Sequence, residues 1–176
     1  MLTPSEKKAI EKGFIALKII WIAMFGTLLI YVIICHKFGH EIRQAVRTEL
    51  PITHLKYIFL GLSIGTLLLT HHLRRLMLTV RSVGPVIKFA DQPSYSNQPQ
   101  ALGKYTAVVI VSLALSESIG LYGLVLFFLG GSFQTLYTFI IISAFAMLYY
   151  RPKQEELVML AVSMQVEKEQ TPQYLH

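Results

Sequence analysis

The chain has 176 residues, of which 53% are hydrophobic and 15% are charged, and its formal net charge at pH 7 is +6. A soluble domain of this size with a mean hydropathy of +0.52 would have too few charged side chains to cover its apolar surface, so the composition indicates a membrane protein. The positive charge does not require nucleic acid, because basic residues beside membrane spans face anionic lipids. We therefore expect membrane lipids, and no nucleic acid, among its partners.

Four apolar stretches are long enough to cross about 30 Å of hydrocarbon at about 1.5 Å of rise per residue. They predict an all-α, polytopic membrane protein with four transmembrane helices. The predicted segments are a cytoplasmic N-terminus (1–13), a first span (14–36), an outer loop (37–54), a second span (55–73), a cytoplasmic basic helix and linker (74–104), a third span (105–129), a tight turn (130–132), a fourth span (133–150) and a cytoplasmic amphipathic tail (151–176). The first span has no small-x-small cleavage signature, so we expect it to remain as an anchor.

The distribution of cations predicts the orientation of these spans. With four crossings, the N-terminus, the loop 74–104 and the tail share one side, and most lysines and arginines fall there. The opposite side holds fewer, namely Lys37, Arg43, Arg47 and Lys56. Because cytoplasmic segments are enriched in Lys and Arg, we expect both termini in the cytoplasm and the chain in a bacterial inner membrane.

The tail offers an apolar stripe at helical spacing, which predicts an amphipathic helix. The stripe consists of Leu157, Leu160, Ala161 and Met164. This helix is expected to lie either on the membrane surface or against the cytoplasmic loop helix.

Glu117 lies near the middle of the third predicted span, in LALSESIGLYGLVLFFLGG (113–131). About 20 Å of helical rise separates it from Lys104, which puts it close to the bilayer midplane. A charged carboxylate there costs about 3 kcal/mol, so the side chain should face protein, water or an ion. Otherwise it should stay protonated, because desolvation disfavours the charged form.

The neighbours of Glu117 suggest a binding site. Ser118 is adjacent and Tyr122 is one turn beyond Ser118, so both hydroxyls are within reach of the region. A carboxyl, a hydroxyl and a phenol are hard oxygen ligands, which suit a proton or Na⁺ rather than a transition metal. A strip of small residues also recurs every four positions, on which another helix can approach closely. The strip consists of Ser112, Ser116 and Gly120.

The sequence SESIGLYGLVLFFL (116–129) resembles the outer-helix motif of rotary ATPase c subunits, the proteolipids that form the ion-carrying membrane ring of F- and V-type ATPases. The shared pattern is Glu117-Ser118-x-Gly120-x-Tyr122-Gly123-Leu124-Val125. The segment GKYTAVVIVSLALSES (103–118) is similar to the lead-in of that family's ion-carrying helix. The resemblance covers the second and third spans, is strongest over 116–125, and implies a proteolipid-like central hairpin.

In the sodium-binding members that this pattern is similar to, the glutamate, the next serine and a backbone carbonyl bind the ion, and the tyrosine holds the glutamate. The resemblance thus implies ion binding by Glu117, Ser118 and the carbonyl of Leu115, with Tyr122 in the supporting role. The family's inner helix is rich in glycine. Its counterpart here has two glycines for close helix packing, and the third span adds a third; these positions are Gly61, Gly65 and Gly123.

We therefore expect a c-subunit-like membrane protein that binds H⁺ or Na⁺ at Glu117, in a homo-oligomer or with other membrane-complex subunits, and takes part in ion translocation. The alternative is a non-catalytic accessory or assembly subunit in which Glu117 is a structural tie. No catalytic motif is present, so activity as an enzyme on its own is not expected, and the expected cofactors are none beyond H⁺ or Na⁺. A redox subunit is a weaker interpretation, because the histidines suit an interface better than a haem or metal site. They are His36, His40, His54, His71 and His72.

Overall fold

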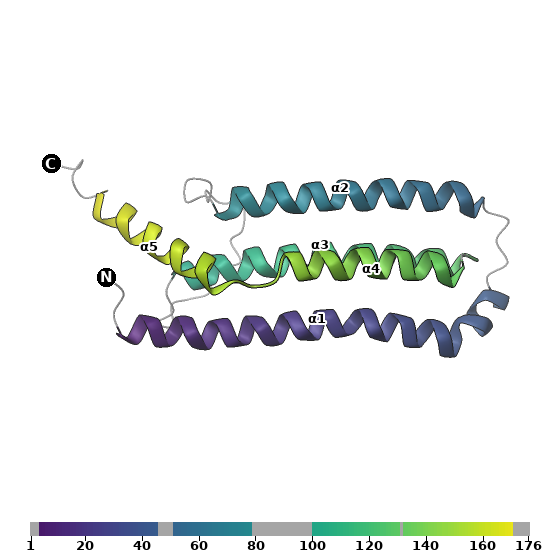
Figure 1. Cartoon of the computed structure of the whole chain (residues 1–176), viewed down its shortest axis with the longest axis horizontal. Coiled ribbons are helices and arrows are strands. Elements are labelled where there is room, and N and C mark those ends of the chain that lie inside the picture. The colour runs from purple at the N-terminus through teal and green to yellow at the C-terminus, as the bar shows by residue number, and fades with distance from the viewer. Residues whose placement is uncertain (1–3, 46–50, 79–99, 131, 171–176) are drawn as a thin grey trace.

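The computed structural model describes residues 4–45, 51–78, 100–130 and 132–170. These residues form five helices, which confirms the all-α prediction. The helices are α1 (Pro4–Ala45), α2 (Ile52–Leu78), α3 (Gln100–Phe128), α4 (Phe133–Tyr149) and α5 (Gln154–Gln170). The first four run alternately up and down as a bundle, and α5 leaves the bundle at an angle (Figure 1).

The helix α3 is the centre of the bundle, because α1, α2, α4 and α5 all pack against it. The helices α1 and α2 lie on opposite sides of the α3–α4 pair (Figure 1). The helices α1 and α3 stay in contact along their length with nearly the same offset in sequence. Gly13 faces Leu102 at one end and Gly39 faces Phe127 at the other, so these two helices run parallel.

Three helices are long and apolar enough to cross a membrane, and a fourth crossing is present if α4 and α5 count as one bent span. The three apolar segments are Ile10–Gly39, Ile52–Leu78 and Ala101–Phe128, and the pair Phe133–Tyr149 and Gln154–Met164 is bent by 47°. The predicted spans 14–36, 55–73 and 105–129 correspond to α1, α2 and α3, and 133–150 corresponds to α4. The helix α1 continues beyond its predicted span to Ala45, and much of the linker 74–104 lies outside the described residues.

The turn between α3 and α4 makes an antiparallel hairpin. Gly130 has φ of +110°, a conformation that side-chain-bearing residues rarely adopt. Ser132 then caps α4, since its hydroxyl accepts a hydrogen bond from the backbone N–H of Thr135 at 3.3 Å. The two helices pack closely because Gly123 lies directly against Phe139.

The helix α2 places its polar side chains inward and its apolar ones outward, as expected for a helix in lipid. Ser63, Thr66 and Thr70 are buried against the bundle. Each hydroxyl donates to the carbonyl four residues earlier in its own helix, at 2.7 to 2.8 Å. Gly61 and Gly65 lie on the outer face, where an added Cβ would meet nothing within 4 Å.

A buried arginine fixes the bend between α4 and α5. Arg74 of α2 is 8% exposed and donates to the carbonyl of Tyr150 at 3.0 Å and to Glu156 Oε2 at 2.6 Å. Tyr105 of α3 donates to the carbonyl of Lys153 at 2.9 Å and accepts from its N–H at 2.7 Å. Side chains from two other helices therefore satisfy the backbone groups that the bend leaves outside a helix.

The helix α5 packs its apolar stripe against the bundle. Leu157, Leu160 and Ala161 are at most 4% exposed and belong to the same core cluster as Ala101 and Leu102 of α3. Among the described residues the stripe packs against α3, and most of the predicted loop helix lies outside them.

Candidate functional site

Glu117 of α3 is partly buried and faces α1. The hydroxyl of Tyr31 donates to Glu117 Oε1 at 2.9 Å, and Thr27 Oγ1 lies 2.6 Å from the same oxygen. Both partners come from α1, far away in sequence. The carboxyl group therefore sits at the contact between two parallel helices, near the middle of the apolar segment of each.

The positions of Thr27 and Tyr31 follow from helix geometry. Residues four apart lie on the same helix face one turn from each other, so both hydroxyls meet a single point on the neighbouring helix. Leu28, between them in sequence, is buried at 2% exposure, and it contacts the position of Gly120 one turn along α3 from Glu117. The absence of a side chain at Gly120 lets α1 come close enough for the hydroxyls to reach Glu117.

Thr27 contacts two oxygen atoms with one hydroxyl proton. Its Oγ1 lies 2.6 Å from the carbonyl oxygen of Met24 and 2.6 Å from Glu117 Oε1. A backbone carbonyl can only accept a hydrogen bond, and an ionised carboxylate can only accept as well. The protonation state of Glu117 therefore decides whether both short contacts contain a proton.

The residues expected to bind an ion with Glu117 are not gathered around its carboxyl group. Ser118 donates instead to the carbonyl of Leu115 at 2.7 Å, so these two groups contact each other. Tyr122 lies on the side of α3 that faces α2, where its ring stacks on Phe59 with 5.3 Å between centroids. Within the described part of the chain, the hydrogen bonds to Glu117 come from Thr27 and Tyr31 and none comes from Tyr122.

The strip of small residues on α3 is covered by α4 of the same chain. The buried hydroxyl of Ser143 donates to the carbonyl of Ser116 at 2.7 Å. A Cβ on Gly120 would lie 3.4 Å from Ser143 Oγ and 2.7 Å from Leu28 Cδ2. Ser112 is also buried and donates to the carbonyl of Val108 within α3. The strip thus packs helices within the chain, and it is not a free surface for a second copy.

Sequence reasoning missed Thr27 and Tyr31 as partners of Glu117. A signal was present, since the two are hydroxyl-bearing residues four apart in an otherwise apolar span. Nothing in the sequence indicated which of the other helices lies against Glu117, and the family resemblance directed attention to the third span itself.

The histidines do not form a metal centre in the part of the chain that the structure describes, where no cluster of three or more His, Cys, Asp or Glu side chains could hold an ion. His36 instead packs its ring on Phe133 at 4.8 Å between centroids and contacts the hydroxyl of Tyr137 at 3.4 Å. This contact joins α1 to the start of α4.

The fold and the apolar helices define the class of this chain as an all-helical, multi-pass membrane protein. Compared with known proteins, it matches no family model, no curated protein sequence and no solved structure.

Proposed function

We propose that this protein binds and releases a proton at Glu117 within the membrane, as a c-subunit-like component of an oligomer or a larger membrane complex. The observation that carries the proposal is the proton count at Thr27, whose single hydroxyl lies 2.6 Å from two oxygens. Two further points support it: the resemblance of 116–125 to an ion-carrying helix, and the position of Glu117 in the middle of an apolar helix.

If Glu117 is protonated, each of the three contacts in the cluster can contain one proton. In that state the carboxyl O–H would donate to Thr27 Oγ1 across the 2.6 Å contact, while Thr27 donates to the carbonyl of Met24 and Tyr31 donates to Glu117. With Glu117 ionised, Thr27 has to share one proton between two acceptors, and one of the 2.6 Å contacts is left without a hydrogen.

Release of the proton is also within energetic reach. A carboxylate near the midplane costs about 3 kcal/mol on insertion scales. Each hydrogen bond from Tyr31 or Thr27 to a charged carboxylate offsets about 1.5–3 kcal/mol of that cost. These donors therefore offset part of the cost of the ionised form.

A proton fits the geometry better than Na⁺. The ligands that the resemblance implies for Na⁺ include Ser118 and the carbonyl of Leu115, but these two already form a hydrogen bond with each other at 2.7 Å. Sodium binding there would require Glu117 to turn away from Thr27 and Tyr31, its present partners on α1. A proton does not require this change.

A structural role for Glu117 is the second candidate. The observation in its favour is that both hydroxyl partners belong to the same chain and join α1 to α3. In this case the carboxyl group would stay protonated at every pH and would only tie the two helices together.

Labelling of Glu117 by a hydrophobic carbodiimide in the purified protein, followed by mass spectrometry across pH with and without Na⁺, separates these functions. The reagent needs a protonated carboxyl reachable from lipid, so we expect labelling that falls as the pH rises and ignores Na⁺. The exposed carboxyl of Glu155 on α5 is the internal control for labelling of a carboxyl group outside the apolar helices. Glu117→Gln identifies the peptide that carries the label at Glu117. Protection by Na⁺ would instead indicate a sodium site, and a Glu117 that never reacts or reacts equally at every pH would favour the structural tie.

A further inference from the structure

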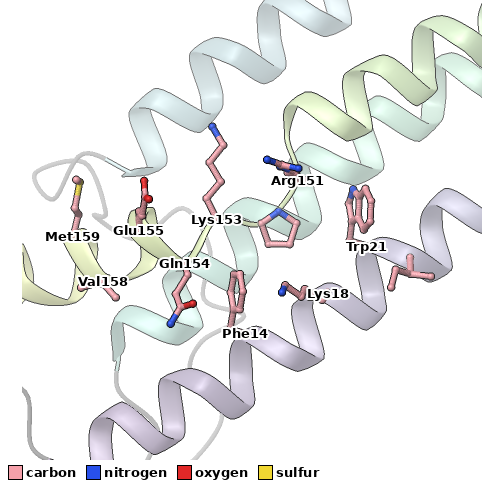
Figure 2. A pocket seen from close by; sticks show the side chains of 11 residues that line it. Phe14, Lys18, Trp21, Arg151, Lys153, Gln154, Glu155, Val158 and Met159 are labelled. Atoms are coloured by element: carbon pink, nitrogen blue, oxygen red, sulfur yellow. The ribbon is translucent and has the colours of Figure 1, made fainter.

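An open groove of about 1010 Å³ lies between the first turns of α1 and the α4–α5 bend. Its floor is apolar, formed by Phe14, Trp21 and Ile22 of α1 and by Val158 and Met159 of α5. Figure 2 shows the two walls, with α1 on one side and the segment that begins at Arg151 on the other. The volume is at the upper end of the roughly 300–1,000 Å³ that is usual for small-molecule sites.

Two cations, Lys18 of α1 and Arg151 at the bend, line this groove. Trp21 Nε1 donates to the carbonyl of Met147 at 3.0 Å, which fixes the register between the antiparallel helices α1 and α4. Lys18 lies one turn before Trp21 and Arg151 one turn after Met147, so both are at the height where the apolar part of α4 ends. Tryptophan, tyrosine and basic residues at such a level mark the boundary between hydrocarbon and lipid head groups.

These two cations are available to an anion. Among the described residues, the ion pairs are Arg74–Glu156 and Lys153–Glu156, and neither uses Lys18 or Arg151. Lys18 lies over the Phe14 ring at 4.9 Å from its centroid, inside the groove. One carboxylate, Glu155, also lines the groove, but it stands at the α5 end and points away from Lys18 (Figure 2).

The apolar floor continues onto a surface that faces lipid. Ile22 lines the groove and is 61% exposed, and Ile19 beside it is 62% exposed. A soluble anion would use the cations and leave this apolar surface in water. An amphiphile would use both, with its charge at Lys18 and Arg151 and its chains along α1.

We propose that this groove binds the head group of an anionic phospholipid from the surrounding bilayer. The proposal is independent of proton binding at Glu117, because the groove shares no residue with the cluster around that carboxyl group. A lipid held there would contact both α1 and the α4–α5 bend, beside the hydrogen bond of Trp21 to Met147.

The single tryptophan of the chain makes the proposal measurable, since Trp21 lines the groove. The full-length protein is placed in phosphatidylcholine vesicles that contain a small, equal fraction of either brominated phosphatidylglycerol or brominated phosphatidylcholine. We expect the brominated anionic lipid to quench Trp21 fluorescence more strongly at equal fraction. Lys18→Gln and Arg151→Gln should each lower this preference about fivefold, which corresponds to one basic residue near an anionic surface.

The matched control is the double variant Lys8→Gln/Lys12→Gln, which removes two exposed cations of α1 outside the groove. The preference should survive in this control and in the charge-preserving variant Lys18→Arg. Equal quenching by the two lipids in the wild-type protein overturns the proposal without any variant. An equal loss of preference in the control also overturns it, because the preference would then come from general surface charge.

Discussion

Two tyrosines lie on opposite sides of α3. The structure gives Tyr31 as the partner of Glu117, whereas the family resemblance implies Tyr122. The hydroxyl of Tyr31 donates to Glu117, whereas Tyr122 stacks on Phe59. Tyr31→Phe removes a hydroxyl that donates to Glu117, so the pH dependence of carbodiimide labelling of Glu117 should change. Tyr122→Phe is the control and should leave the pH dependence unchanged; the reverse pattern would contradict the placement of Glu117 against α1.

Two adjacent carboxylates on α5 test the buried ion pair. Glu156 holds Arg74, whose side chain is 9% exposed, at 2.6 Å, whereas Glu155 is exposed. Glu156→Gln should destabilise the protein by about 3 kcal/mol, because it leaves a buried arginine without its counter-charge. Thermal unfolding in detergent measures this as a lowered Tm. Glu155→Gln should leave the Tm nearly unchanged, and an equal loss in both variants would mean that the pair is not what holds the bend.

At the residue scale, the sequence predicted that Glu117 needs a polar partner or a proton, but not which residues are its partners. The cost of a midplane carboxylate requires a polar partner or a proton whatever the fold. Thr27 and Tyr31 could not be identified because they are 90 and 86 positions away, and only packing decides which helix faces α3. Arg74 begins the segment predicted as a cytoplasmic basic helix, yet it is buried, and its partner Glu156 comes from the tail.

Glycines on two different helices test the packing of elements. A Cβ at Gly123 of α3 would lie 2.6 Å from Phe139 Cβ and 3.3 Å from the carbonyl oxygen of Leu136. Gly123→Ala should therefore force α3 and α4 apart and cost about 1–3 kcal/mol. Gly61→Ala on the open face of α2 meets nothing within 4 Å and should stabilise the monomer by up to about 1 kcal/mol through helix propensity.

Unfolding of the two glycine variants in detergent, with the native mass measured in parallel, checks both signs. A stable Gly123→Ala variant would contradict the close approach of α3 and α4. If Gly61→Ala lowered the native mass, the outer face of α2 would be a contact between copies of the chain, in agreement with the proposed oligomer.

At the scale of elements, apolar length identified the helices, because roughly twenty apolar residues in lipid have few alternatives to a helix. The antiparallel α3–α4 hairpin could also be predicted from local sequence, because Gly130 and Ser132 form a break too short for anything but a tight turn. The sequence did not predict which face of α2 is buried. Both the face with Ser63, Thr66 and Thr70 and the face with Gly61 and Gly65 carry small residues, and only the first meets the bundle. The placement of α5 on α3 was open because an apolar stripe does not specify what covers it.

At the scale of the whole molecule, the predicted orientation places one end of the bundle in the cytoplasm and the other on the opposite side of the membrane. The helices α1 and α5 begin at one end of the bundle, and α2 begins at the other (Figure 1). In a Cys35→Ser background, single cysteines at Lys8 and Gln154 should react with an impermeant maleimide from the cytoplasmic side of membrane vesicles, and a cysteine at Thr53 should react from the opposite side. All three positions are exposed, so a reversed pattern would contradict the orientation predicted from the cations, and labelling of Lys8 and Gln154 from different sides would contradict the four-crossing topology.

The central claim for the whole protein is that Glu117 is a neutral acid that can lose its proton. Infrared difference spectroscopy of the protein in lipid, titrated across pH, tests it most directly, because only a protonated carboxyl group gives a carboxylic-acid carbonyl stretch. Glu117→Gln keeps an oxygen for Tyr31 and assigns the band by its absence. We expect a band that disappears on raising the pH and is missing in Glu117→Gln. A Glu117 band that stays constant at every pH, or no such band at any pH, would contradict it.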